Sequence, residues 1–181
     1  MLSILNSKES KELDLYTIKN NITSKDKLID NAGRSVAYHI IEHIENPFNK
    51  KFLCIAGAGD NGIDAVVCNF YLNRNNVNST LLIIDPSKID ASYLKHHSFL
   101  TPSNKIKLST FDYIVDGVFG TGLNRNLEED YFSIVNAMNK HGNIISIDIP
   151  SGIYTDSGNE SNISVNSIHT VTFAYPKIGH Y

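Results

Sequence analysis

The sequence predicts a three-layer α/β/α sandwich of the Rossmann-like class, with a mostly parallel sheet and extra helices at the N-terminal end. Short apolar segments of strand length alternate with segments of helical periodicity. Three of the strand-like segments are followed by loops that combine glycines with polar residues. Because the loops after parallel strands gather at one edge of the sheet, these three loops could line one crevice.

Two helices are expected before the first strand. The first covers 5–18, where Leu13 and Leu15 stand among charged residues. The second is expected to begin after Ser24, a favourable N-cap, and to end at Pro47. Its apolar residues recur every three or four positions, as on one face of a helix.

The rest of the chain reads as strands of Val, Ile, Leu and Phe separated by helices, with turn residues between them. The elements expected, in order, are a strand at 51–56, a helix after the glycine-rich loop, a strand at 80–84, a helix at 87–100, a strand at 113–119, a helix at 127–140, a strand at 143–149, a polar loop to 164 and a strand at 168–174.

Composition limits the function classes. The 181 residues suffice for one domain with a substantial core, and the net charge of -3 gives no bulk attraction to nucleic acid or membranes. No apolar segment approaches the ~20 residues of a membrane helix, and 1–15 does not resemble a signal peptide. Cys54 and Cys68 lie in apolar segments and are expected to be reduced thiols. We therefore expect a cytoplasmic protein with a small-molecule ligand.

The first loop, Gly57 to Gly62, matches the G-x-G-x-x-G dinucleotide fingerprint between a strand and a helix. Glycines let the backbone approach a phosphate, and the following helix offers free N–H groups. Asp85, at the end of the next strand, is placed as in NAD-dependent dehydrogenases, which keeps that function open. Asp60, Asn61 and Asp64 add polar groups that a simple phosphate cradle does not need.

The two later loops each begin near a carboxylate at the end of a strand, Asp116 and Asp148. Each alone is compatible with a capping or turn role. Together with the first loop they indicate a site, because Asn61, Asp116 and Ser151 all offer oxygens that suit a hard cation of low charge. Arg125 is placed to pair with a phosphate.

Five ordered blocks, covering nearly the whole chain, resemble the NAD(P)HX epimerases, also called YjeF N-terminal domains. The blocks are 28–34, similar to LMENAGR; 57–64, similar to GPGNNGGD; 115–123, similar to VDALFGTGL; 148–152, similar to DIPSG; and 170–177, similar to TVTFGAPK. The resemblance implies a single domain over 1–181 that interconverts the R and S forms of hydrated NADH and NADPH. It also implies a homodimer and a partner dehydratase that uses ADP or ATP, separate or fused.

The resemblance further implies one potassium ion per subunit, bound by Asn61, Asp116 and Ser151. Contacts with the damaged nucleotide would come from Asp60, Asn61, Gly62, Ile63, Asp64, Gly120, Thr121, Gly122, Leu123, Asn124, Arg125, Asn126, Tyr131 and Asp148. Asp148 is our candidate catalytic acid–base residue, since a positioned carboxylate can protonate a leaving hydroxyl and deprotonate an attacking water. Lys177 is a further candidate.

Several positions depart from the family pattern. Ile63 and Ala65 replace glycines, Asp60 replaces a neutral asparagine, and Tyr175 replaces a small residue. If Ile63 needed a positive φ, strain would follow; if its side chain pointed aside, little would change. Family members generally continue after residue 179 with another strand and helix, as if this chain were shortened or separated from a fused dehydratase. These departures leave open a non-catalytic, nucleotide-binding scaffold.

Overall fold

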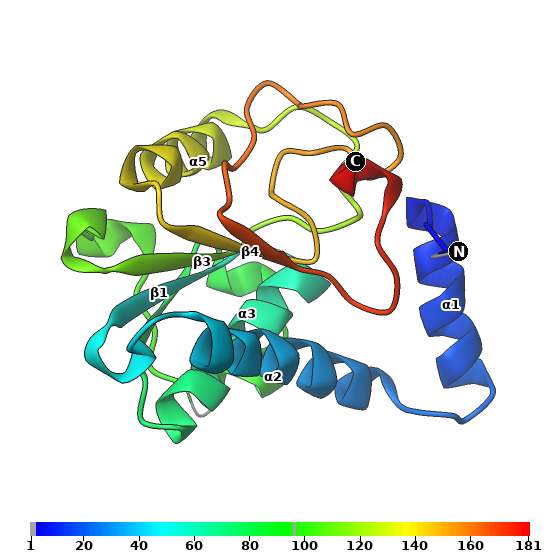
Figure 1. Cartoon of the computed structure of the whole chain (residues 1–181), viewed down its shortest axis with the longest axis horizontal. Helices are drawn as coiled ribbons and strands as arrows, with labels where there is room; N and C mark the ends of the chain where they lie inside the picture. Colours follow the sequence, from blue (N-terminus) through cyan, green and yellow to red (C-terminus); the bar gives the residue numbers. More distant parts are fainter. Residues whose placement is uncertain (1–2, 96) are drawn as a thin grey trace.

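The computed structural model describes residues 3–95 and 97–181 and confirms the predicted parallel α/β/α sandwich (Figure 1). Its five-stranded sheet has the order β2-β1-β3-β4-β5, and every neighbouring pair is parallel. The strands are β1 Lys51–Ala56, β2 Asn78–Ile83, β3 Tyr113–Gly117, β4 Ile144–Ile147 and β5 His169–Val171.

Helices cover both faces of the sheet, and each face has its own apolar core. In β1, Phe52 and Cys54 pack in the core shared with α2 Lys25–His43 and α3 Asp60–Arg74. The alternate residues Leu53 and Ile55 pack in the core shared with α5 Glu129–His141. This alternation is the side-chain periodicity of a strand, so both faces of β1 are buried.

The N-terminal helix α1 Ser7–Lys19 differs from the other long helices because none of its residues is buried. The Asn6 side chain accepts a hydrogen bond from the Glu9 N–H, and the Glu9 carboxylate accepts one from the Asn6 N–H, as in a capping box. Figure 1 shows α1 apart from the two helical layers, beside the end of the sheet where the strands finish. The helix therefore contributes little to the core and instead flanks the sheet's carboxyl edge.

The expected helix at 87–100 is wrong. The segment contains only the 3-10 turn Pro86–Lys88 and the short α4 Ala91–Leu94, and residue 96 lies outside the described residues. The Asp85 and Asp90 side chains each accept a hydrogen bond from the backbone two residues on, which favours local turns. Leu100 then exchanges backbone bonds with Leu81 and Ile83 and covers the edge of β2.

Two helix boundaries also differ from expectation. α2 ends at His43 rather than at Pro47, because Ile44 is already extended; Pro47 instead begins a 3-10 turn at Pro47–Asn49. α5 begins at Glu129 rather than 127, because Asn162 holds both backbone groups of Leu127 in the loop. The other 3-10 turns are Pro102–Asn104, Leu108–Thr110 and Ile178–His180.

The start of α3 accommodates Ile63 and Ala65, the two residues that stand where the family pattern has glycines. Gly59 has φ +106°, a backbone conformation that residues with a side chain rarely adopt, and it is the N-cap of α3. Ile63 lies within α3 without a positive φ, and its side chain is buried in the α2–α3 core. Ala65 is fully buried against Gly117, where an added Cβ would stand 2.5 Å from the Ala65 Cβ. Ile63 therefore adds no backbone strain, and the missing side chain at Gly117 makes room for Ala65.

We predict that Gly117→Ala destabilises the protein by about 1–3 kcal/mol, because its Cβ would meet both Ala65 and, at 2.9 Å, the Asn61 carbonyl oxygen. Ala65→Gly alone should cost about 1 kcal/mol through its lower helix propensity. In the double variant part of the Gly117→Ala cost should disappear. Urea unfolding of the four proteins measures this coupling, and simply additive costs would show that the two positions do not share space.

Candidate active site

A cleft of about 1470 Å³ lies where the three predicted loops meet at the carboxyl edge of the sheet. It is bounded by α1 and the start of α2 as well as by these loops. The structure brings nine of the predicted site residues to its wall: Asp60, Asn61, Asp64, Gly120, Thr121, Gly122, Leu123, Asn124 and Asp148.

Five predicted contact residues lie outside this wall. Gly62 packs so closely on the Gly57 carbonyl that a Cβ would lie 2.0 Å from its oxygen, and Ile63 is in the core. Arg125 is largely exposed and pairs with Glu128 at 3.6 Å. Asn126 accepts a bond from the Tyr154 hydroxyl, and Tyr131 packs on Phe119 with ring centroids 4.8 Å apart.

Asp116 lies beneath the cleft and ties the second loop to the third. Its Oδ1 accepts from the Ser151 hydroxyl at 2.6 Å and from the Val118 N–H at 3.2 Å. Its Oδ2 accepts from the Ser146 hydroxyl at 2.9 Å and from the Ser151 N–H at 3.0 Å. Complete burial raises the pKa of Asp116, while these four donated bonds oppose the shift.

Asp148 occupies a strained turn immediately after β4. Its φ is +64°, and the Ile149 N–H bonds to the Ile147 carbonyl across it at 2.8 Å. This combination matches the rarer, strained form of the γ-turn. A residue held in such a conformation needs support from its surroundings, and such residues cluster at functional sites. The turn directs the Asp148 carboxylate to the cleft.

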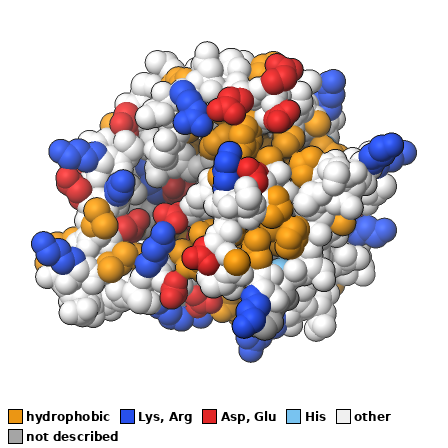
Figure 2. Space-filling view, turned by 180° about the vertical axis from the view of Figure 1, so that it is seen from behind, with side chains coloured by type: hydrophobic (Ala, Val, Ile, Leu, Met, Phe, Trp, Pro, Cys, Tyr) orange, Lys and Arg blue, Asp and Glu red, His pale blue; other side chains and the backbone are white. Residues whose placement is uncertain are grey.

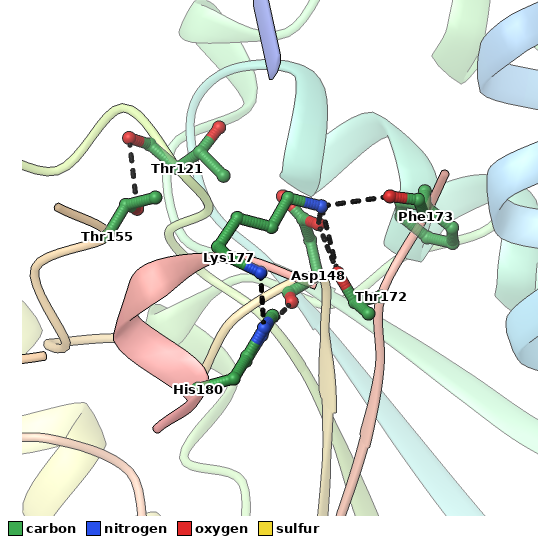
Figure 3. A network of polar contacts seen from close by, with 7 residues as sticks. All are labelled: Thr121, Asp148, Thr155, Thr172, Phe173, Lys177 and His180. Carbon is green, nitrogen blue, oxygen red and sulfur yellow. Dashed lines mark hydrogen bonds and ion pairs between the residues drawn. The ribbon is translucent and has the colours of Figure 1, made fainter. Parts of the chain in front are cut away.

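Lys177 provides that support from the C-terminal segment (Figure 3). Although it is only 1% exposed, its ammonium group has three acceptors: Asp148 Oδ1 at 2.6 Å, Thr172 Oγ1 at 2.8 Å and the Phe173 carbonyl at 3.0 Å. Thr172 also donates to Asp148 Oδ1 at 3.1 Å. All three ammonium protons are thus used, which is how a buried lysine remains charged.

A second turn of the same kind presents the Phe173 carbonyl. Ala174 has φ +58°, and the Tyr175 N–H bonds to the Phe173 carbonyl at 2.7 Å. His180 closes the network, because its Nδ1 accepts from the Lys177 N–H at 2.9 Å while Nε2 lies 2.8 Å from the Asp148 carbonyl. These two partners select the neutral imidazole with its proton on Nε2. The sequence pattern gave no signal for His180 or Thr172.

The rest of the cleft wall carries both acidic and basic side chains. Asp60 pairs with Lys25 at 2.8 Å, which offsets the charge that replaces the family's neutral asparagine. Burial raises the pKa of Asp64 well above its ordinary value, and Asp148 and Asp60 add to the shift. Burial therefore favours the protonated form of Asp64. Figure 2 shows the molecule from behind the view of Figure 1, with positive and negative side chains interspersed around hydrophobic ones.

The structure removes one of the two observations that favoured a dehydrogenase, the placement of Asp85, and leaves the glycine fingerprint. Asp85 does not line the cleft, and its carboxylate is taken by Ser87 and by Lys88 at 3.4 Å. A second cavity, of about 660 Å³, lies between α3 and β2 and has none of the predicted site residues on its wall. Within the described residues, no helix is long and apolar enough to cross a membrane. Cys54 and Cys68 are buried free thiols, as predicted.

A parallel α/β sandwich with a large cleft over its strand ends, and a carboxylate–ammonium pair inside it, defines a small-molecule-binding protein of the Rossmann-like class. Comparison with known proteins then identifies the family: residues 25–179 match the profile described as YjeF-related protein N-terminus, and the chain belongs to this family.

Relatives of two kinds are similar to this chain. The NAD(P)H-hydrate epimerase of Oenococcus oeni is 33% identical, covering 97% of this chain and 87% of the relative. The bifunctional NAD(P)H-hydrate repair enzyme Nnr of Thermofilum pendens is 32% identical over 95% of this chain, which spans 36% of that longer protein. The crystal structure of yeast ynu0 has a TM-score of 0.86 at 25% identity, covering 99% of this chain and 83% of the yeast chain.

We predict that Asp116→Asn destabilises the protein by about 3 kcal/mol or more, because the amide would turn an NH₂ group toward hydrogen-bond donors. Ser146→Ala, which removes one of the four bonds, is the matched control and should cost about 1–2 kcal/mol. Urea unfolding compares the two variants. Equal costs would mean that Asp116 is not the node that joins the loops.

Proposed function

We propose that this protein is an NAD(P)H-hydrate epimerase that interconverts the R and S forms of hydrated NADH and NADPH. The observation that carries the proposal is the Asp148–Lys177 pair, held at 2.6 Å on the wall of a dinucleotide-sized cleft. Membership of the YjeF N-terminal family and the names of the relatives support it.

The reaction inverts one carbon, which carries a hydroxyl next to the ring nitrogen. The nitrogen lone pair forms a C=N bond as the C–O bond breaks, and the hydroxyl takes a proton and leaves as water. A water molecule then attacks the other face of the iminium carbon, the electron pair returns to nitrogen, and the attacking water gives up a proton. The protein must supply one proton and accept one proton in each turnover.

Asp148 is our candidate for this proton transfer. Oδ1 is engaged by Lys177 and Thr172, whereas Oδ2 accepts no hydrogen bond from the described residues. The ammonium group fixes the position of the carboxylate, so Oδ2 faces the cleft for proton transfer without movement of the loop. The strained turn, together with Lys177 and Thr172, thus positions Oδ2 of Asp148 for proton transfer.

The first two loops are proposed to hold the dinucleotide. The amino end of α3, which begins at Asp60 after Gly59, offers free N–H groups to a phosphate. The loop 120–124 lines the same cleft, and Asn61 Nδ2 is buried there without a partner, which suits a ligand oxygen. Arg125 and Asn126 stand at the outer end of that loop as further candidate contacts.

A potassium ion is proposed beside Asn61, Asp116 and Ser151. This donor set combines one carboxylate with an amide and a hydroxyl oxygen, which suits a hard cation of low charge. Gly120 leaves room for the Asn61 side chain, since a Cβ would lie 3.2 Å from Asn61 Oδ1. Asp116 would free a lone pair if the Ser151 hydroxyl turned to the Phe119 carbonyl, 3.2 Å away. When bound, the ion would supply positive charge that favours ionised Asp116.

Three further proposals concern partners and location. The bifunctional relatives, whose name is repair enzyme Nnr, support a dehydratase partner that consumes the S form. A homodimer is proposed from the family resemblance alone. A cytoplasmic location is supported by the buried free thiols Cys54 and Cys68, since reducing conditions preserve such thiols.

A non-catalytic, nucleotide-binding scaffold is the second candidate. It was favoured by the replaced glycines, but Ile63 and Ala65 pack into the core rather than into the cleft. The retained network around Asp148 has no use in a scaffold, because a strained turn and a buried lysine both cost stability. These observations favour the enzyme.

We predict that the purified protein feeds an S-specific dehydratase with substrate from a mixture of R and S NADHX. Without it, only slow spontaneous epimerisation should follow exhaustion of the S form. Asp148→Asn should reduce the rate at least ~100-fold, the lower end of what positioned acid–base groups contribute. Asp130→Asn is the control, because Asp130 is exposed at the start of α5 and does not line the cleft. A folded wild-type protein that leaves the slow phase unchanged would favour the scaffold.

We also predict that the melting temperature is higher in potassium chloride than in N-methylglucamine chloride at equal ionic strength. Binding to the native state alone should raise it by roughly 2–4 °C for each kcal/mol of binding free energy. Asn61→Ala should abolish the difference while the protein still folds. Identical melting curves of the wild-type protein in the two salts would contradict the potassium site.

A further inference from the structure

The proposed reaction poses a geometric problem that Asp148 alone does not solve. Water leaves from one face of the ring and a second water arrives at the opposite face, so proton transfer is needed on both faces. A carboxylate on one side reaches only one of them within hydrogen-bond distance. Enzymes that invert a carbon centre by displacement with water commonly place two carboxyl groups on opposite sides of it.

The side of the cleft away from the sheet is formed by α1, which lies outside the matched family region. The α1 residues that line the cleft are Ser7, Lys8, Ser10, Lys11, Leu13, Asp14, Leu15 and Ile18. Of these, Ser7, Ser10, Lys11, Asp14 and Ile18 recur every three or four residues and share one face of the helix. Since α1 buries no residue, this mostly polar face is turned toward the cleft and not toward a core.

The helix is fixed in this position by its first residues. Ser7 donates to the Asp156 carboxylate from its N–H at 2.6 Å and from its hydroxyl at 2.7 Å. Just before it, Leu5 exchanges backbone bonds with Pro176 and Ile178, on either side of Lys177. The same segment that supports Asp148 therefore also holds α1 across the cleft from it.

Asp14 is the acidic residue of that inward face. Asp14 is exposed, and its carboxylate has no hydrogen bond or ion pair within the described part of the chain, so it is free to contact a ligand in the cleft. Although part of the side chain reaches solvent, desolvation raises the pKa of Asp14, and Lys177, Asp148 and Asp60 are the charged groups that act on it most. Lys11 shares its helix face, and Lys25 and Asp64 face the cleft from α2 and α3.

We propose that Asp14 is a second catalytic acid–base residue, which serves the ring face opposite to the one served by Asp148. This inference rests on the proposed epimerase function. In one direction the Asp14 carboxylic acid gives its proton to the departing hydroxyl, and the Asp148 carboxylate takes a proton from the attacking water. One water leaves, one water enters, and one proton passes from Asp14 to Asp148; the reverse turnover restores both groups.

An oxygen-isotope experiment distinguishes this arrangement from a single acid–base group. The wild-type enzyme in H₂¹⁸O should convert either pure epimer to the other and label both. Asp14→Asn should lower inversion at least ~100-fold, because one face has lost its group. Asp148 can still expel and return water on its own face, so the variant should still exchange ¹⁸O into one epimer without inversion.

Glu12→Gln is the matched control, because Glu12 lies on the same helix, is exposed and does not line the cleft. It should behave as wild type. An Asp14→Asn variant that inverts at the wild-type rate would overturn the inference, and so would one that loses exchange of both epimers together with inversion. A wild-type protein that neither inverts nor exchanges would instead refute the epimerase function itself.

Discussion

The buried carboxylate of Asp116 is the interaction on which the site depends. It sits at the end of β3, and its four hydrogen bonds reach the second loop, the third loop and the neighbouring strand β4. A buried carboxylate is costly unless its lone pairs are used. One bond to Asp116 comes from the nearby Val118 N–H, and the other three come from Ser146 and Ser151, which meet Asp116 only in the folded sheet. The polar network therefore fixes the Ser151 loop, and with it the turn at Asp148, relative to the rest of the sheet.

In the C-terminal segment, the ion pair and hydrogen bonds of Lys177 stabilise two strained turns. The turns at Asp148 and Ala174 are unfavourable by themselves, yet they present a carboxylate and a carbonyl to the same ammonium group of Lys177. Burial of Lys177 costs desolvation free energy, which the three acceptors of its ammonium protons offset only in part. Leu5 pairs with this segment, so α1, the Lys177 segment and the Asp148 loop form one unit around the cleft. Pre-organisation of this kind is what acid–base chemistry on a small ring requires.

Sequence patterns predicted the sheet and the cleft for physical reasons. Buried strands such as β1 are recognisable in the sequence as short apolar segments. Because the carboxyl ends of parallel strands meet at one edge of the sheet, the sequence already predicted that Asp60, Asp116 and Asp148 lie near one crevice. The sequence could not exclude a helix at 87–100. Asp85 and Asp90 favour turns there through local side-chain hydrogen bonds, and the hydrophobic periodicity does not register these bonds. The cleft-lining face of α1 and the hydrogen bonds of His180 to Lys177 and Asp148 could not be predicted in this way. They depend on contacts between segments far apart in the chain, which periodicity does not encode.

A structure of the protein with hydrated NADH bound tests the central claim most directly, because it shows which end of the dinucleotide meets Asp148. The ring carbon that carries the hydroxyl is expected over the Asp148 carboxylate, with its oxygen about 2.6–3.2 Å from a carboxyl oxygen of the protein. The phosphates are expected at the amino end of α3. A dinucleotide bound with its adenine beside Asp148, or outside the cleft, would contradict the assignment of this cleft as the epimerase site.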